Sequence, residues 1–137
     1  MMEQLKALVE RRGAKIRPAN IDSIRELQTR LGFVLAPEYA AFLSLFGVIV
    51  SGAAEVYGLG VPDNYYLNVG NAFEDLSSAP GYPRNAVPLL DVGDGRYYLY
   101  DNSTRKVVLW ATPNGGIMEV LDTTLESFLV KQVFQSC

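Results

Sequence analysis

The 137-residue sequence is 49% hydrophobic and 20% charged with a formal net charge of −3, which is typical of a soluble globular chain long enough to bury a core. It holds no histidine and one cysteine, Cys137, so it offers no Ser-His-Asp or Cys-His arrangement, no thiolate metal site and no internal disulfide. No apolar run approaches the roughly 20 residues that cross a bilayer, and charges interrupt the N-terminal segment, unlike in a signal peptide. We therefore expect a cytoplasmic protein with no membrane span.

Apolar side chains at helical spacing predict two helices near the start of the chain. The first covers residues 2–12 and stops at Gly13, because glycine readily adopts the left-handed conformation that ends a helix. The second begins after Asn20, a favoured N-terminal cap, and ends at Gly32. Residues 15–19, between the two helices, contain a proline and predict a loop.

A third helix is predicted to begin at Pro37, whose fixed φ suits a first helical turn. Apolar residues then recur at helical spacing and predict one buried face, made of Tyr39, Phe42, Leu43 and Phe46. Gly47 follows as the C-terminal stop. The most apolar window of the chain, residues 45–54, predicts a passage from this buried helix end into a strand.

The middle of the chain gives weaker signals. Residues 55–59 (EVYGL) predict a strand placed to pair with later strands. A fourth helix is predicted from Asp63 or Asn64 to Leu76, and the prolines and glycine of residues 77–83 predict a loop.

The second half of the chain predicts an antiparallel meander. Its four β-prone runs are separated by turn residues and cover 87–92, 96–100, 106–110 and 117–121. The first two runs are joined by Gly93-Asp94-Gly95, and an Asp-Gly step of this kind closes β-hairpins. Trp110 ends the third run and is expected in the core.

A closing helix completes the predicted fold. Thr123 and Glu126 have the spacing of a capping box, in which each side chain satisfies a free N–H at a helix start. The elements together predict an α+β fold, with N-terminal helices, a central, mostly antiparallel sheet ending in the meander, and a C-terminal helix. We expect one domain over residues 1–137.

Three aspartates around the hairpin suggest either a calcium or acid–base site or ordinary turns. Asp91, Asp94 and Asp101 do not match the twelve-residue calcium loop with its closing glutamate. Each lies at or beside a turn, where aspartate side chains bind nearby backbone N–H groups. We interpret them as turn residues, and the sequence predicts no catalytic, metal or cofactor site.

Tyrosines of the meander raise a second question. On a strand, Tyr98 and Tyr100 share one face and Tyr97 lies on the other. One face must pack on helices, whereas the other either presents tyrosine to a partner or is itself covered. Tyr65 and Tyr66 raise the same question near the acidic part of the chain.

Charge is unevenly distributed. Residues 1–30 hold seven basic and four acidic side chains, whereas residues 31–83 hold five acidic and no basic ones. This distribution argues against a nucleic-acid binder. It fits either an acidic face that meets a basic partner or a mildly acidic solvated surface, and charge alone favours the second.

Ordered blocks of the sequence resemble the SUKH superfamily, which includes the Smi/Knr fungal cell-wall regulators and many bacterial immunity proteins. Residues 35–43 (LAPEYAAFL) resemble its Leu-Pro-x-x-Tyr-x-x-Phe-Leu block, residues 56–59 (VYGL) its apolar-Tyr-Gly-Leu block, and residues 87–101 its Pro-to-Asp-Gly-to-Asp strand pair. Residues 107–110 and 125–129 are similar to its closing strand and helix. The matched positions with family or structural roles are Pro37, Tyr39, Phe42, Leu43, Tyr57, Gly58, Pro88, Gly95, Asp101 and Trp110.

The resemblance implies a non-enzymatic bacterial immunity protein that occludes the active site of a cognate toxin. A regulatory or scaffold module of the Smi/Knr type and a small-ligand-binding domain are the alternatives. We expect a protein partner with a basic surface, no nucleic-acid or membrane partner and no cofactor, and the oligomeric state stays open. The charge distribution places the partner-binding surface at Glu38, Glu55, Asp63, Tyr65, Tyr66, Glu74 and Asp75.

Overall fold

The computed structural model describes residues 2–135, so Cys137 lies outside the described residues. Its helices are α1 (Glu3–Arg12), α2 (Ile21–Leu31), α3 (Pro37–Leu45), α4 (Val69–Ser77) and α5 (Leu125–Leu129), which continues as a π-helical segment at Val130–Gln135. Its strands are β1 (Lys15–Ile16), β2 (Ile49–Ser51), β3 (Ala54–Val56), β4 (Ala86–Gly93), β5 (Arg96–Asp101), β6 (Lys106–Ala111) and β7 (Gly116–Leu121). Among residues 2–135, no helix combines the length and hydrophobicity that a membrane crossing requires.

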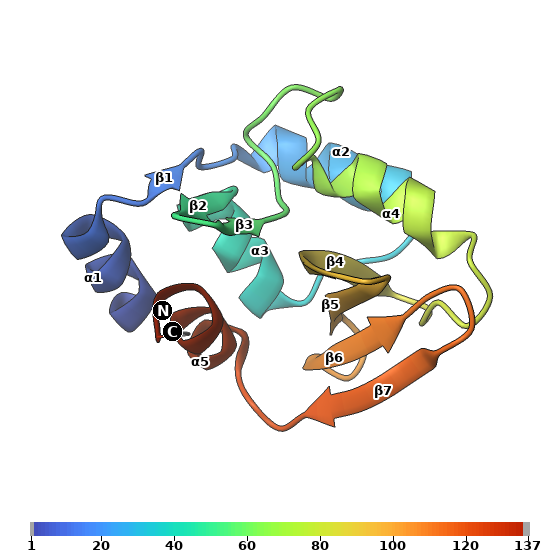
Figure 1. Ribbon diagram of the computed structural model, residues 1–137. Coiled ribbons are helices and arrows are strands. Elements are labelled where there is room, and N and C mark those ends of the chain that lie inside the picture. The colour runs from blue at the N-terminus through green and yellow to red at the C-terminus, as the bar shows by residue number, and fades with distance from the viewer. Residues whose placement is uncertain (1, 136–137) are drawn as a thin grey trace.

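The strands form two antiparallel sheets, in the orders β1-β2-β3 and β4-β5-β6-β7. The second sheet is the predicted meander. The backbone N–H of Tyr57, just after β3, donates to the carbonyl oxygen of Leu89 in β4 at 2.9 Å and so joins the small sheet to the meander. Figure 1 shows α1 beside α5 at one end of the molecule and α2 beside α4 at the other. The predicted α+β fold with its closing helix is confirmed.

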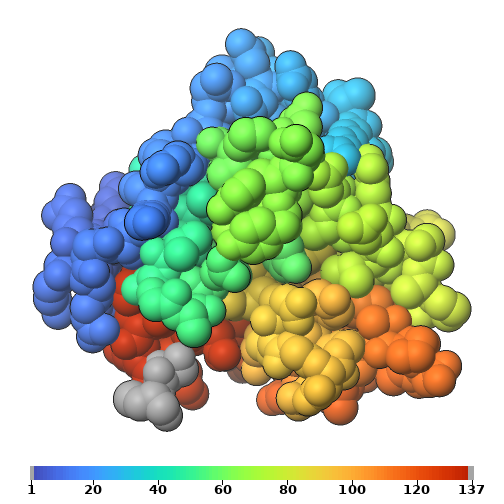
Figure 2. Space-filling view, turned by 45° about the horizontal axis from the view of Figure 1, so that its top comes forward, coloured from blue at the N-terminus to red at the C-terminus, as the bar shows by residue number. Residues whose placement is uncertain are grey.

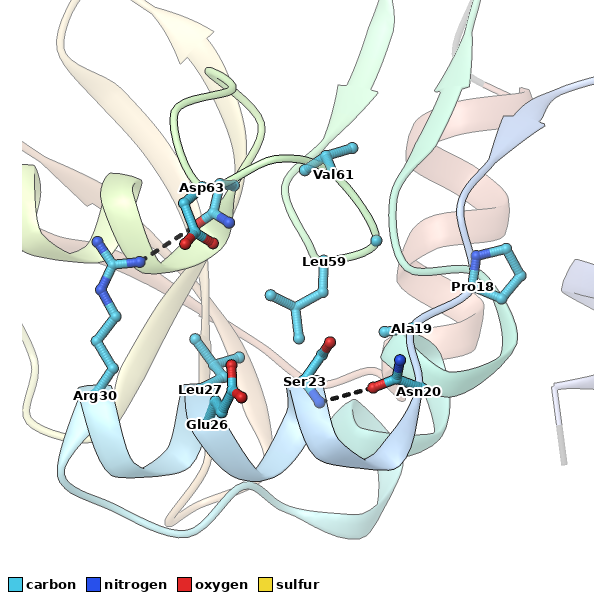
Figure 3. A pocket seen from close by; sticks show the side chains of 12 residues that line it. Pro18, Ala19, Asn20, Ser23, Glu26, Leu27, Arg30, Leu59, Val61 and Asp63 are labelled. Atoms are coloured by element: carbon cyan, nitrogen blue, oxygen red, sulfur yellow. Dashed lines mark hydrogen bonds between the residues drawn. The ribbon is translucent and has the colours of Figure 1, made fainter.

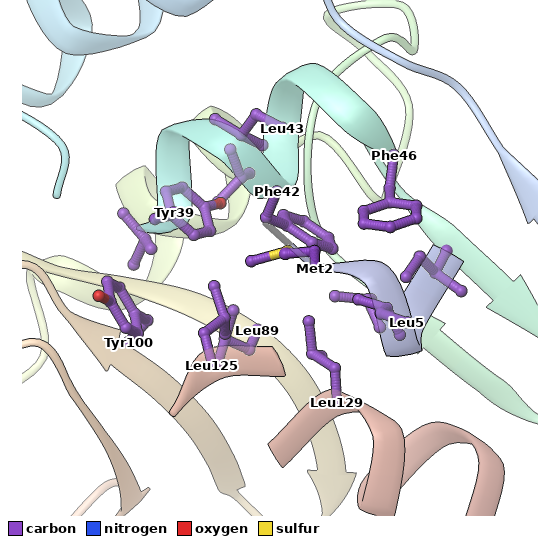
Figure 4. Packing of buried hydrophobic residues seen from close by; sticks show 14 of the residues in the cluster. Met2, Leu5, Tyr39, Phe42, Leu43, Phe46, Leu89, Tyr100, Leu125 and Leu129 are labelled. Atoms are coloured by element: carbon purple, nitrogen blue, oxygen red, sulfur yellow. The ribbon is translucent and has the colours of Figure 1, made fainter. Parts of the chain in front are cut away.

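The main core forms where α3 meets the meander, α1 and α5 (Figure 4). The Tyr39 ring stacks on Tyr100 of β5, with ring centroids 5.7 Å apart, and on Phe42 at 5.9 Å. Fully buried side chains come from α1, α3, β4, β5 and α5, and include Leu5, Tyr39, Phe42, Leu43, Leu89, Tyr100, Leu125 and Leu129. The predicted apolar face of α3 is therefore the centre of the fold.

The opposite face of the meander is covered as well. Leu99, Val108 and Trp110 form a second cluster there, and Tyr82, from the segment after α4, packs edge-on against Trp110 with centroids 5.1 Å apart. The indole N–H of Trp110 donates to the carbonyl of Gly81 at 3.0 Å. This face is therefore covered around Trp110, which lies in the core as predicted, whereas Tyr97 on the same face stays only partly buried.

Two predicted segments near β1 and α4 are wrong in detail. The predicted loop at 15–19 contains β1, which pairs with β2. The helix predicted from Asp63 or Asn64 begins only at Val69, because Asn68 Oδ1 accepts the backbone N–H of Asn71 at 3.1 Å and caps the helix at that point.

Two further boundaries are also shifted. The strand predicted over 55–59 ends at Val56. The closing helix is capped by Thr124 rather than Thr123, since Thr124 Oγ1 accepts the N–H of Ser127 at 3.0 Å. Glu126 instead accepts the backbone N–H of Leu5 at 3.1 Å and ties the helix to α1.

Glycines allow a close backbone crossing that holds both ends of the 60–67 loop. A Cβ atom at Gly58 would lie 1.6 Å from the carbonyl oxygen of Gly47, so no larger residue fits without moving the backbone. The N–H of Leu59 donates to that same carbonyl at 3.1 Å, and Gly58 forms a single bridge with Asn68. The loop therefore leaves and rejoins the fold at one place.

The turn residues behave as the sequence predicts. Asp91 Oδ1 accepts the N–H of Gly93 at 2.9 Å, and Asp101 Oδ1 accepts the N–H of Ser103 at 2.8 Å. Gly95 has a φ of +74° and lies against the carbonyl of Thr112, where a Cβ atom would come within 2.3 Å. Pro37 occupies the first turn of α3, and Pro88 lies in β4 beside a bulge.

A tyrosine-lined hollow as the candidate functional site

An open hollow of about 410 Å³ lies under the 60–67 loop. Its wall is formed by the end of β3, the loop, one side of α4 and the start of β5, and its lining includes Tyr57, Asn64, Tyr65, Tyr66, Asn71, Glu74, Asp75 and Tyr97. Figure 2 shows the loop (green) standing above the β4–β5 hairpin (gold), with α4 (yellow-green) beside both. We call this site the tyrosine hollow.

Two of its tyrosines stand on the loop. The rings of Tyr65 and Tyr66 have centroids 4.7 Å apart and are 39% and 58% exposed. The hydroxyl of Tyr66 donates to a carboxylate oxygen of Glu55 in β3, and this bond raises the pKa of Tyr66 well above its ordinary value. Glu55 therefore fixes the orientation of the exposed ring pair.

The other two tyrosines form the floor and are partly buried. Burial raises the pKa of Tyr57 to about 12, and the Asp91 carboxylate is the next largest cause. The pKa of Tyr97 is raised by burial, then by Asp91 and Asp75. The charges that act on this floor are negative, so the hollow favours a cation.

Arg30, on the neighbouring helix α2, binds two residues of α4, one of which in turn binds the loop. Its Nε donates to Glu74 Oε2 at 2.6 Å, and its Nη2 donates to Asn71 Oδ1 at 2.6 Å. This ion pair lowers the pKa of Glu74 and raises that of Arg30. Asn71 Nδ2 in turn donates to the backbone carbonyl of Asp63 in the loop. Glu74 is therefore neutralised from within the chain.

A second groove, of about 450 Å³, lies on the other side of the loop, against α2 (Figure 3). Its lining mixes charges of both signs, with Glu26 and Asp63 as the acids and Arg30 as the base. This groove offers no electrostatic preference comparable to that of the tyrosine hollow.

The structure brings together most of the surface residues predicted from the sequence. Tyr65, Tyr66, Glu74 and Asp75 line the tyrosine hollow, and Glu55 contacts it through Tyr66. The side chain of Asp63 lines the groove against α2.

Glu38 lies apart from this group. Its carboxylate accepts the hydroxyl proton of Tyr100 at 2.7 Å and the backbone N–H of Leu125, so it links α3, β5 and α5.

Several contributors to the hollow do not appear in the predicted surface set, among them two tyrosines and one arginine. Tyr57, predicted only as a family-motif or structural residue, lines it from just after β3, and Tyr97, whose role the sequence leaves open, lines it from β5. Arg30 contacts its lining residue Glu74 from 44 positions earlier in the chain. The stretch of residues 31–83 without a basic side chain gave no sign that Arg30 folds back onto it.

Comparisons with known proteins add two findings. A family model described as SUKH_5: SMI1-KNR4 cell-wall matches residues 1–135. A crystal structure described as that of a protein from Pseudomonas syringae pv. tomato superposes with a TM-score of 0.74 at 19% sequence identity, covering 98% of this chain and 97% of that one. No curated protein sequence matches the chain significantly. The structural likeness is one of fold.

Proposed function

Because the chain belongs to the SMI1-KNR4 (SUKH) family, we propose that it is a non-enzymatic immunity protein that neutralises a cognate toxin by covering its active site. The family match spans residues 1–135 and supports a single domain. We propose that this neutralisation takes place inside the producing cell, in the cytoplasm.

The observation that carries the proposal is the grouping of predicted residues at one site. Exposed tyrosines and the carboxylates of Glu55 and Asp75 occupy the same face as the 60–67 loop. Acidic groups speed the approach of a basic partner, and aromatic side chains at the centre of an interface hold it. A toxin cleft that binds an anionic substrate has the complementary positive charge.

Occlusion also requires area beyond the hollow. A stable complex covers about 800 Å² on each partner, which is several times the mouth of one hollow. The 60–67 loop, the exposed side of α4 and the tip of the β4–β5 hairpin adjoin the tyrosine hollow and supply that surround (Figure 2). In the complex, these surrounding surfaces would exclude water from the tyrosines at the centre.

A rescue assay in the native host tests the proposal. The C-terminal domain of the protein encoded beside this chain is expressed with and without it. Growth arrest that this chain relieves, together with co-purification of the two proteins, is the expected result. A harmless neighbour, or arrest that this chain fails to relieve, would contradict immunity and favour the regulatory or ligand-binding alternatives.

The acidic face is tested with matched variants of the same pair. The triple variant Glu55→Gln, Asp63→Asn, Asp75→Asn is expected to weaken the complex about tenfold or more and to flatten its salt dependence. Its control removes three negative charges from other elements, with Glu10→Gln, Asp22→Asn and Glu119→Gln, and is expected to bind almost normally. Equal binding by both variants would exclude the acidic face as the interface.

A further inference from the structure

Four tyrosine rings line the tyrosine hollow from three separate parts of the chain. Tyr57 follows β3, Tyr65 and Tyr66 stand on the loop, and Tyr97 lies in β5. Ring faces carry negative potential, and several rings around one space attract an organic cation. The rings of Tyr65 and Tyr66 are tilted by 47° to each other, so their faces are not parallel.

Three polar groups in the hollow lack partners within residues 2–135. Within residues 2–135, the Asp75 carboxylate makes no hydrogen bond or ion pair, and the hydroxyls of Tyr57 and Tyr97 make no hydrogen bond. Each oxygen can accept an N–H. Glu74 is different, because Arg30 already occupies it at 2.6 Å. The hollow thus presents one unpaired carboxylate and two free acceptor hydroxyls.

The charged groups that act on the two floor tyrosines are all negative. The carboxylates that act on Tyr57 are those of Asp91, Glu55 and Asp75, and two of them also act on Tyr97. Arg96 precedes Tyr97 on the strand and therefore points to the opposite face of the sheet. A cation that enters the hollow meets negative potential from several sides.

We infer that the tyrosine hollow is a socket for one guanidinium group, presented by an arginine side chain on the surface of the protein partner. This inference rests on the proposed function and names the chemistry of its anchor. A guanidinium is flat, stacks on aromatic faces and directs several N–H donors in a fixed fork, which matches rings beside a carboxylate and two hydroxyls. A lysine ammonium is compact and strongly hydrated, so it gains less from the same walls.

The test uses a probe and needs no partner. Nα-acetyl-arginine methylamide is titrated into the full chain while the aromatic ring signals are followed by NMR. The ring signals of Tyr57 and Tyr97 are expected to shift with saturation. The lysine analogue is expected to bind roughly fivefold more weakly, given the greater stacking of guanidinium. The citrulline analogue, which has nearly the same shape without the charge, is expected to cause no saturable shift.

Variants separate binding from folding. Asp75→Asn keeps the shape of an exposed side chain and is expected to weaken binding of the arginine probe roughly fivefold. Tyr97→Phe keeps the ring and is expected to weaken it by a smaller factor. Asp22→Asn removes the same charge from α2, away from the hollow, and is expected to bind the probe normally.

Each contrary outcome is decisive. Equal shifts with the citrulline or lysine probe, unchanged affinity in Asp75→Asn, or absence of saturable shifts at the hollow would overturn the socket. The rescue assay reports separately on the proposed function. Rescue without probe binding would leave immunity standing and remove the socket, whereas probe binding without rescue would retain a guanidinium site and remove immunity.

Discussion

The core around α3 and the tyrosine hollow each contain a hydrogen bond from a tyrosine hydroxyl to a glutamate carboxylate, but in different surroundings. In the core, the hydroxyl of Tyr100 donates to Glu38, which also accepts the N–H of Leu125. In the hollow, the hydroxyl of Tyr66 donates to Glu55 at the surface. Tyr100 is fully buried, whereas Tyr66 is 58% exposed. One pair joins three elements, and the other orients a ring toward solvent.

This difference shows how tyrosine serves either stability or binding. The Tyr39 and Tyr100 rings stack in the enclosed core, where their area is removed from water on folding. Tyr65 and Tyr66 also contact each other, yet much of their area stays available for a partner. Area left exposed on folding is the area that an interface can bury.

The largest expected effect is on the core. Phe42→Ala removes a fully buried ring beside Tyr39 and is expected to lower the free energy of unfolding by about 3–5 kcal/mol. Tyr66→Ala, at the hollow, is expected to change it little, because the ring is exposed. Urea unfolding followed by circular dichroism measures both. Comparable losses would show that the 60–67 loop is part of the cooperative core and would break the comparison.

A smaller effect is expected for the two glutamates. Glu38→Gln leaves one acceptor oxygen facing two donors, Tyr100 and Leu125, and is expected to lower the free energy of unfolding by about 1–2 kcal/mol. Within residues 2–135, Glu55 accepts only the hydroxyl of Tyr66, at the surface. The free energy of unfolding of Glu55→Gln is therefore expected to stay near that of the unaltered chain. A larger decrease in the urea midpoint for Glu55→Gln than for Glu38→Gln would contradict this and show that the pair at the hollow contributes more to stability.

The same division explains what could be predicted from the sequence. The apolar face of α3 and the meander follow from local periodicity and from turn residues such as Asp94 and Gly95. The start of α4 was predicted too early, because Asp63 and Asn64 are also favoured helix caps and Asn68 is the residue that caps the helix. Local pattern therefore located the elements better than their boundaries.

Local sequence patterns could not predict contacts between distant parts of the chain. Arg30 neutralises Glu74 across 44 positions, and Glu38 turns inward to Tyr100 across 62. Charge distribution still grouped residues that lie close together in the structure, because Glu55, Asp75 and the loop tyrosines come from one acidic part of the chain. It did not include Tyr57, or Tyr97, which the meander brings in from the second half of the chain.

The smallest expected effect sharpens the comparison at a single hydroxyl. The Tyr39 hydroxyl is buried without a hydrogen-bond partner among residues 2–135, and burial raises the pKa of Tyr39 well above its ordinary value. A buried unpaired hydroxyl destabilises the folded state, so Tyr39→Phe is expected to raise the free energy of unfolding by about 1 kcal/mol while keeping the stacked ring. Tyr57→Phe removes a hydroxyl that also lacks a partner within that range but lies in the open hollow, and stability is expected to stay constant while binding of the arginine probe weakens. Urea unfolding of the two variants measures the contrast. A loss of stability in Tyr39→Phe would mean that this hydroxyl is hydrogen-bonded in solution, and that the core too depends on the polar end of tyrosine.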